Sequence, residues 1–582
     1  MKIEKLLLGL FASFLMVGCS QNDDAPNASE EAKGKDSYMS IKISSDLASR
    51  ANTGDFVDGT GAESEVSSIH FFFFKQDGTP FTLQVPDDTD LAHIDKTRSR
   101  QNYIYVDNTG NRLAIESENA NHIEKILNAF VVFKVVDSNY PSSIIAVLNW
   151  DYQADAALSK DDLMTNLIAE NEAITSTDFI MTNSVYKSDD YTTIFDAKTV
   201  NETNFGTSVT DANLQAVELH VERLAARVTT TVDGTQVPTG EYSEEVSNGK
   251  TIPTFKVAET PDLNNDGVLD EVIYAQLLGW DLNTTITHSY LVKKLNDSWT
   301  DANTPFAGWN DYSTKRSNYS VSVPEGTYGT TKVSHNKSFV WSELANSKNT
   351  FGGTDYCLEN TSEIIEEGNK QQTNVLVAAQ LVKKESNGNN TPVTVCRWGT
   401  FYYVGLDALA DAVAANIANY VDIQGENLNI VPVYDYSNDS NPDNTSKTTY
   451  QVRFTIASNA SDTYPTPGGG SITKADVDAI LAQKGTANVW MDGKTYYFTP
   501  IKHIVETTQK DAVIRNNAYN VVITGVSGLG TPVYTPPIVP GVTPDEPIIP
   551  DPILPGESET FISAKINVLS WRVVNNSVVL GQ

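Results

Sequence analysis

Nine prolines crowd the 24 residues from Pro532 to Pro555, near the end of the chain. Proline lacks the backbone N–H that a sheet interior requires, so we expect an extended polyproline II spacer that reaches up to about 75 Å. One more strand-like segment follows, Phe561–Leu580. A single strand is not stable alone in water. This segment must therefore either join its own sheet across the spacer or dock on another molecule, and the stiff spacer favours the second. Its predicted apolar face is formed by alternate residues, namely Ile562, Ala564, Ile566 and Val568.

The other end of the chain indicates export. Lys2 and Lys5 precede the apolar run Leu6–Val17, which has the length of a signal-peptide core and is too short to span a membrane. Small residues and then Cys19 close this run, and the pattern resembles a bacterial lipobox. That resemblance implies a lipid on Cys19 and removal of residues 1–18. An ordinary signal peptide with a chance cysteine is the alternative. The polar residues after Cys19 are similar to surface-export signals of Bacteroidetes lipoproteins.

The composition of the chain excludes some classes of function. The 582 residues carry 41 Lys+Arg against 74 Asp+Glu, a net charge of −33, which excludes general binding to nucleic acid. Hydrophobic residues make up 40%, enough for packed cores, and the length allows about three to five domains, or two large ones. With three cysteines and seven scattered histidines, the chain has no disulfide framework and no recognisable catalytic metal motif.

The body is predicted to be mostly β. Runs of β-branched and aromatic residues bounded by turn residues indicate strands over 37–44, 69–74, 129–136, 143–150, 218–228 and 375–382. Fewer segments have helical periodicity, and these are 160–169, 406–421 and the stretch that a capping residue opens at 471–476. Strands joined by turns, with a few inserted helices, predict β-sandwiches.

The sequence contains two further candidate sites, a calcium-binding loop and a disulfide. Asp262, Asn264, Asp266 and Asp270 have the spacing of calcium ligands in an EF-hand loop, but Ile273 stands where the bidentate glutamate belongs. The alternative is a turn between strands. Cys357 and Cys396 are a candidate disulfide in an exported protein, and two buried thiols are the alternative. We expect no obligatory cofactor; Ca²⁺ is the one candidate ion.

Several strings together resemble the Bacteroidales major-fimbrium subunits, or fimbrillins, of the FimA/Mfa type, nearer the Mfa branch. Each string is weak alone, but their order and spacing are specific. They are FIMTNSVY (Phe179–Tyr186), VERLAARV (Val221–Val228), DYCLENTS (Asp355–Ser362), YYFTPIKHI (Tyr496–Ile504), VIRNNAYNVVITGVSGLGTP (Val513–Pro532) and AKINVLSWRVV (Ala564–Val574).

The resemblance implies two transthyretin-like β-sandwich domains and a defined processing route. An arginine-specific protease would cut between Arg50 and Ala51, which lie in a polar loop after the first strand. Loss of that strand would open an apolar groove, and the C-terminal strand of another subunit would fill it by β-augmentation. The expected parts are a signal peptide (1–18), a propeptide (19–50), two sandwich domains (51–218 and 219–531), a spacer (532–559) and a donor strand (560–582).

We therefore expect a non-enzymatic shaft subunit of a type V-like surface fimbrium that serves adhesion and biofilm formation. Its expected partners are copies of itself in a linear homopolymer, anchor and tip subunits, the maturation protease, and host or bacterial surface receptors. It would begin as an outer-membrane lipoprotein precursor and end in an extracellular fimbrium. The alternatives are a tip or anchor subunit and a glycan-binding surface lipoprotein of a nutrient-uptake system; a secreted hydrolase lacks any catalytic constellation in this sequence.

Overall fold

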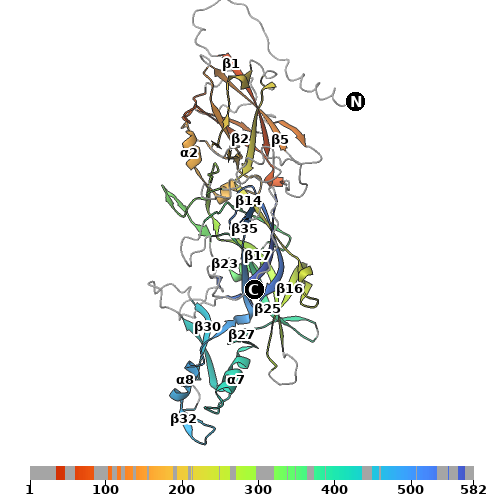
Figure 1. The fold of residues 1–582 in the computed structure, drawn as a ribbon, viewed down its shortest axis with the longest axis vertical. Helices are drawn as coiled ribbons and strands as arrows, with labels where there is room; N and C mark the ends of the chain where they lie inside the picture. Colours follow the sequence, from red (N-terminus) through yellow and green to blue (C-terminus); the bar gives the residue numbers. More distant parts are fainter. Residues whose placement is uncertain are drawn as a thin grey trace, which may run out of the picture.

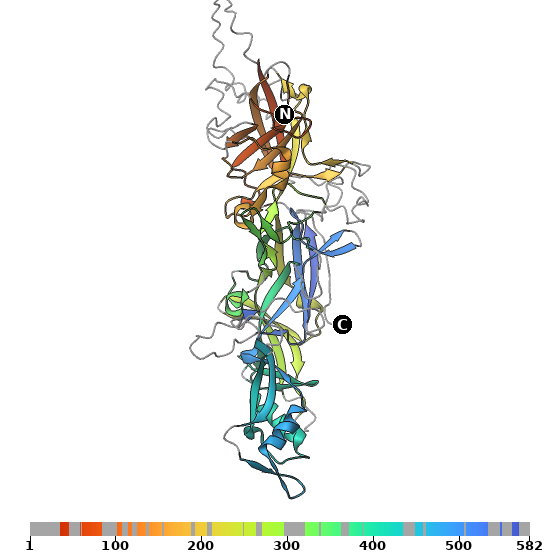
Figure 2. The same ribbon diagram turned by 90° about the vertical axis from the view of Figure 1, so that its left-hand side faces the viewer.

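The structure is a computed structural model, and it confirms a mostly β chain with short helices. It describes residues 35–45, 59, 61–83, 102–107, 114–118, 125–135, 139–153, 156–187, 193–206, 212, 214–247, 249–262, 271–295, 320–336, 339–347, 349–362, 372–386, 388–434, 448–457, 461–505, 508–533, 548–549 and 561–569. Three packed units follow one another along the long axis of the molecule (Figures 1 and 2). In the described part of the chain, no helix is long and apolar enough to cross a membrane.

The first unit is one large sheet wrapped around a core. Both faces of β2 are buried, which explains why its run of four phenylalanines, Phe71–Phe74, does not alternate with polar residues. Odd-numbered positions such as Phe71 and Phe73 face one core, and even-numbered positions such as Phe72 and Phe74 face another. In spatial order the strands are β3 (Tyr103–Asp107), β2 (Ser68–Phe74), β6 (Ser143–Leu148), β8 (Met181–Asn183), β13 (Val217–Arg223), β1 (Lys35–Ser45), β5 (Lys125–Val135) and β4 (Ala114–Glu118), with β11 (Lys198–Thr199) beside β6 and β12 (Phe205–Gly206) beside β1.

The second unit is a β-sandwich. Its core joins Val521 and Ile523 of one sheet to Leu277 and Val377 of the other, around the fully buried Trp280. The smaller sheet has the order β24 (Thr354–Leu358), β14 (Ala225–Val232), β37 (Ala518–Ser527) and β40 (Phe561–Leu569). The larger sheet has the order β15 (Tyr242–Ser247), β16 (Lys250–Glu259), β17 (Val272–Asn283), β25 (Asn374–Lys384), β34 (Lys494–Pro500) and β38 (Thr531–Pro532), with β26 (Asn390–Pro392) beside β25.

The third unit lies at the far end of the molecule (Figure 1). The chain enters it after β26 and returns from it into β34. Two helices, α7 (Leu406–Ile417) and α8 (Lys474–Ala482), pack on a five-stranded sheet around a core of their own. The sequence predicts a capping residue within 471–476, and the structure shows that it is Thr473, with Asp476 completing the capping box. The strands are β28 (Phe401–Val404), β27 (Val395–Trp398), β33 (Ala487–Trp490), β30 (Thr448–Ile456) and β29 (Leu428–Tyr434).

Short elements complete the described part of the fold. The helices are α2 (Lys160–Thr165), α3 (Glu170–Ala173) and α6 (Trp341–Ala345). The strand pairs are β9 (Tyr186–Lys187) with β10 (Ile194–Phe195), β7 (Leu167–Ala169) with β19 (His288–Tyr290), β18 (Thr285–Ile286) with β22 (His335–Asn336), β20 (Gly326–Tyr328) with β21 (Thr331–Val333), β23 (Phe339–Val340) with β39 (Ile548–Ile549), β31 (Thr463–Pro465) with β32 (Ser471–Thr473), and β35 (Lys502–Val505) with β36 (Thr508–Asp511).

Two predicted elements differ from those observed. The run 218–228 is not one strand, because the chain leaves the first unit at the end of β13 and enters the sandwich with β14. The helix expected over 160–169 stops at Thr165, since Leu167–Ala169 pairs instead with β19 of the second unit. In both places, pairing between the units overrides the local apolar pattern.

Candidate assembly interface

The first strand, β1, occupies the middle of the first sheet. It runs parallel to β13 and antiparallel to β5, so its removal would leave both neighbours with an unpaired edge. Met39 and Ile41 are fully buried in the core of this unit. Full burial of two such side chains is worth about 1.5–3 kcal/mol each. The slot that holds β1 is therefore an apolar groove with a hydrogen-bonding edge on either side.

The predicted cut falls between β1 and the body of the unit. Arg50 and Ala51 themselves lie outside the described residues, as does Cys19. On the far side of the cut, Glu63 is almost fully buried and anchors the chain: its carboxylate accepts hydrogen bonds from Arg227 at 3.1 Å and from the Tyr356 hydroxyl at 2.7 Å. A break at Arg50 would therefore free β1 while leaving the new N-terminal segment held at Glu63.

The C-terminal strand, β40, lies at the edge of the smaller sandwich sheet. It runs antiparallel to β37 of its own chain. Its four predicted donor positions, Ile562, Ala564, Ile566 and Val568, lie opposite Val526, Ile523, Val521 and Tyr519. The last three of these β37 residues face the sandwich core. Opposite residues of an antiparallel ladder share a face of the sheet. The four predicted donor positions are therefore on the same face of this sheet as the core-facing residues of β37, which agrees with the alternation expected from the sequence.

The two end strands repeat one another in sequence. Asp36-Ser-Tyr-Met-Ser-Ile-Lys-Ile-Ser44 corresponds to Glu559-Thr-Phe-Ile-Ser-Ala-Lys-Ile-Asn567, with Ser, Lys and Ile identical and most of the rest conservative. On this match Ile562, Ala564 and Ile566 stand where β1 has Met39, Ile41 and Ile43. This signal lies in the sequence itself, but it becomes visible only when the two ends are compared with each other.

Most of the fimbrillin-like strings meet elsewhere, at the joint between the first two units. Glu222 of VERLAARV pairs with Lys293 at 2.9 Å, and both side chains are essentially fully buried. Arg515 of VIRNN pairs with Glu359, also fully buried, and donates to the Leu291 carbonyl oxygen at 3.0 Å. Breaking a buried pair by removing one partner costs about 3–5 kcal/mol. These strings therefore stabilise the joint with buried ion pairs, and Val221, the first residue of VERLAARV, also lines the β1 slot, where it pairs with Ser45.

A partly buried carboxyl group, that of Glu170, lies at the same joint. Burial, with the Asp355 carboxylate second, raises the pKa of Glu170 in α3 to about 7. Its neighbour in the second unit, Cys357, is fully buried, and burial raises the pKa of that thiol well above its ordinary value. The Glu170 carboxyl group therefore lies where α3 of the first unit contacts β24 of the second.

Of the two alternatives for the cysteines, the structure has the two buried thiols and not the disulfide. Cys357 and Cys396 are both free and buried. Cys357 lies on β24 in the sandwich core, whereas Cys396 lies on β27 in the core of the third unit. Both are packed as small apolar side chains in separate cores, and burial raises the pKa of Cys396 to about 12.

The candidate calcium loop connects two paired strands, β16 and β17. Asp262 is described, but Asn264, Asp266 and Asp270 lie outside the described residues. Over the ranges that the structure covers, no group of three His, Cys, Asp or Glu residues could hold a metal ion. Calcium at this loop therefore stays a prediction.

Comparison with known proteins singles out the C-terminal end of the chain. Residues 488–577, which run from β33 through the spacer to beyond β40, match the family model described as major fimbrial subunit protein type IV, fimbrillin, C-terminal. The end of this chain is fimbrillin-like. A comparison with curated proteins finds no match.

Three of the solved structures that are similar to this chain are bacterial proteins. A candidate cell adhesion protein from Parabacteroides distasonis is 10% identical with a TM-score of 0.35, over 93% of this chain and 98% of that one. A candidate cell adhesion protein from Bacteroides eggerthii is 10% identical with a TM-score of 0.33, over 93% and 99%. The tip fimbrial protein Mfa3 from Porphyromonas gingivalis, with a C-terminal truncation, is 11% identical with a TM-score of 0.29, over 92% and 100%.

Proposed function

We propose that this chain is the structural shaft subunit of a surface fimbrium and that it polymerises by donor-strand exchange. It is exported as a lipoprotein through Cys19 and cut between Arg50 and Ala51 by an arginine-specific protease. The β1 strand then leaves, and residues Phe561–Leu569 of a second copy take its place between β13 and β5. The polymer supports adhesion and biofilm formation and ends in separate anchor and tip subunits. Its role is structural and not enzymatic.

One observation carries this proposal: the C-terminal strand repeats the sequence of β1. A strand that enters the β1 slot must present apolar residues at the positions of Met39 and Ile41, which are fully buried. Ile562 and Ala564 satisfy that requirement in the matching register, and Lys565 falls where β1 has Lys42. Main-chain hydrogen bonds to both neighbours would supply strength, and the alternating side chains would fix the register.

In the proposal, the pairing of β40 with β37 is the state of the subunit before assembly. An edge strand has a neighbour on one side, whereas the β1 slot offers neighbours on both sides. Exchange therefore replaces the single ladder with β37 by two ladders, with β13 and with β5. It also covers the apolar core of the first unit, which the departure of β1 exposes. The match of residues 488–577 to the fimbrillin C-terminal model supports the same assignment.

The experiment combines one blocked cut and one deletion in the producing cell. Arg50→Ala should leave full-length lipidated precursor at the membrane and few or no fimbriae. Deletion of Phe561–Gln582 should give a cut subunit, beginning at Ala51, that is folded but does not polymerise. Mass spectrometry of sheared surface protein and electron microscopy provide the two readouts. Fibres formed by the truncated chain, or filaments whose subunits still carry residues 19–50, would refute the proposal.

A further inference from the structure

The two ends of β1 are held unequally in the first sheet. At its start, Lys35 already pairs with β5, and this ladder continues to Ser44. The ladder with β13 runs on for one more residue, to Ser45, which lies level with Val221. Among the described residues, the final position of β1 therefore pairs with one neighbouring strand instead of two. It is also the position of β1 nearest the predicted cut, with only four residues between it and Arg50.

The apolar face of β1 also stops short of this final position. Met39 and Ile41 are buried in the core of the first unit, and Ile43 occupies the next alternate position, on the same face. The alternate position after that is Ser45. Its partner on β13, Val221, is only 2% exposed and belongs to the same core. The sequence of β1 therefore places a polar residue at the last core position of the slot.

The C-terminal strand has an apolar residue at this position. When the match between the two ends is continued by one residue, Val568 stands where β1 has Ser45. Valine gains more than serine from burial against Val221, so the incoming strand makes a contact here that β1 does not make. At the other end of the match, Met39 and Ile562 are apolar residues of similar size. The advantage of the incoming strand over β1 is therefore concentrated at the Ser45 end of the slot.

We infer that the incoming strand enters the slot at the Val221 end and displaces β1 from there toward Met39, an inference that rests on the proposed function. The cut at Arg50 brings a chain end close to Ser45, and strands open first at their ends. Val568 can then pack against Val221 while the rest of β1 is still in place. Each later step exchanges one β1 residue for its match, so the core is never opened to water as a whole.

The test follows displacement of β1 in the full chain without its signal peptide, cut at Arg50. A dye is attached to Cys19, since the other two cysteines are buried. A synthetic peptide of residues 559–569 is added in excess, and a fall in fluorescence anisotropy reports release of the fragment 19–50. The wild-type peptide should release the fragment at a rate proportional to the peptide concentration. The Val568→Ser peptide should do so at least about tenfold more slowly, because it lacks the first contact.

Matched variants identify the end at which entry begins. The Ile562→Ser peptide loses more apolar surface than the Val568→Ser peptide, but at the far end of the slot. It should therefore enter within about twofold of the wild-type rate and dissociate faster afterwards. In the chain itself, Ser45→Val should slow displacement about tenfold. Ser44→Val is its control and should leave the rate unchanged, because position 44 lies on the opposite face, level with the half-buried His220.

The possible failures are distinguishable. If the wild-type peptide does not displace the fragment, the proposed function is refuted, and this inference with it. If the peptide displaces the fragment but Ile562→Ser slows its entry as much as Val568→Ser, the point of entry is wrong and strand exchange stands. Equal effects of Ser45→Val and Ser44→Val would likewise overturn the point of entry alone.

Discussion

Ala564→Ile should make fimbriae harder to take apart. Within the matched stretch, Ala564 is where the C-terminal strand loses the most apolar volume relative to β1, whose Ile41 is fully buried and lies level with Val217 of β13 and Ala129 of β5. Isoleucine has three more carbon atoms than alanine. At about 0.8 kcal/mol per buried methylene, restoring them is worth about 2.4 kcal/mol per subunit contact, or roughly 50-fold in the equilibrium constant.

The assay is the rate at which subunits leave sheared fimbriae at a fixed denaturant concentration, followed by light scattering. The Ala564→Ile fimbriae should dissociate on the order of 50-fold more slowly than the wild type. Asn567→Ile is the matched control, because it adds apolar volume on the opposite face, where β1 has Ser44. Ala564→Ile fimbriae that dissociate as fast as the wild type, or a gain of equal size from Asn567→Ile, would refute the proposed register.

Four further predictions concern the donor strand, Glu170, the two cysteines and the candidate calcium loop. Ile566→Lys would bury an unpaired charge in the β1 slot at a cost of several kcal/mol and should abolish polymerisation seen by electron microscopy, whereas Lys565→Glu on the opposite face should be mild. Because burial raises the pKa of Glu170 to about 7, the folded chain binds this proton more tightly than the unfolded chain, and stability falls as the pH rises from about 4.5 to about 7. Glu170→Gln should therefore raise the melting temperature at pH 8 more than at pH 4, and an equal change at both values would contradict the pKa. Cys357 and Cys396 should react with a thiol reagent only after denaturation, and faster reaction of the native chain would contradict their burial. If Asp262, Asn264, Asp266 and Asp270 bind calcium, millimolar Ca²⁺ should raise the melting temperature and EDTA should lower it; no shift would leave a plain turn between β16 and β17.

Local patterns were enough to predict many elements. The alternation in 37–44, the apolar run at 69–74 and the capping residue Thr473 each produced the expected strand or helix, because local chemistry and tertiary packing agree there. The prediction was wrong where contacts between units decide the structure. The apolar run 218–228 is split between two sheets at Leu224, and no periodicity marks that point.

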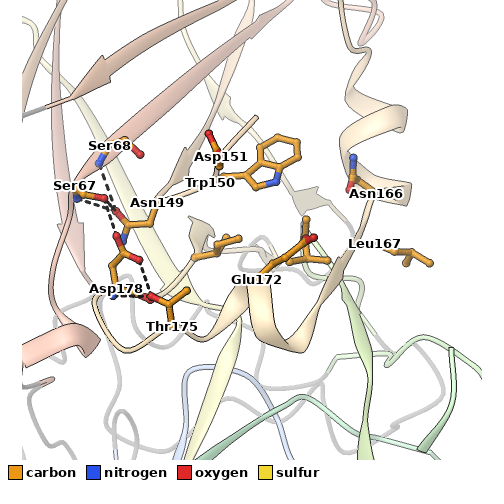
Figure 3. A pocket seen from close by; sticks show the side chains of 12 residues that line it. Ser67, Ser68, Asn149, Trp150, Asp151, Asn166, Leu167, Glu172, Thr175 and Asp178 are labelled. Atoms are coloured by element: carbon orange, nitrogen blue, oxygen red, sulfur yellow. Dashed lines mark hydrogen bonds between the residues drawn. The ribbon is translucent and has the colours of Figure 1, made fainter. Parts of the chain in front are cut away.

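Among the candidate sites, too, the features that depend on local sequence were predictable and those that depend on the fold were not. The period of two in the sequence of β40 specifies which of its residues share a face, so its apolar face was predictable, whereas its register against β37 was not. The separation of Cys357 from Cys396 depends on which core each strand enters, and sequence spacing does not specify this. The depression lined by Ser67, Trp150, Asn166 and Glu172 (Figure 3) could not have been predicted, since these residues are brought together only by the fold and share no motif.

Electron cryomicroscopy of native fimbriae would show whether donor-strand exchange takes place. The decisive feature is the identity of the strand between β5 and β13. We predict density for Phe561–Leu569 of a neighbouring subunit there, with Ala564 level with Val217 and Ala129 and with no residues before Ala51. Density for Met39 and Ile41 in that slot, with β40 still paired to β37 of its own chain, would contradict donor-strand exchange.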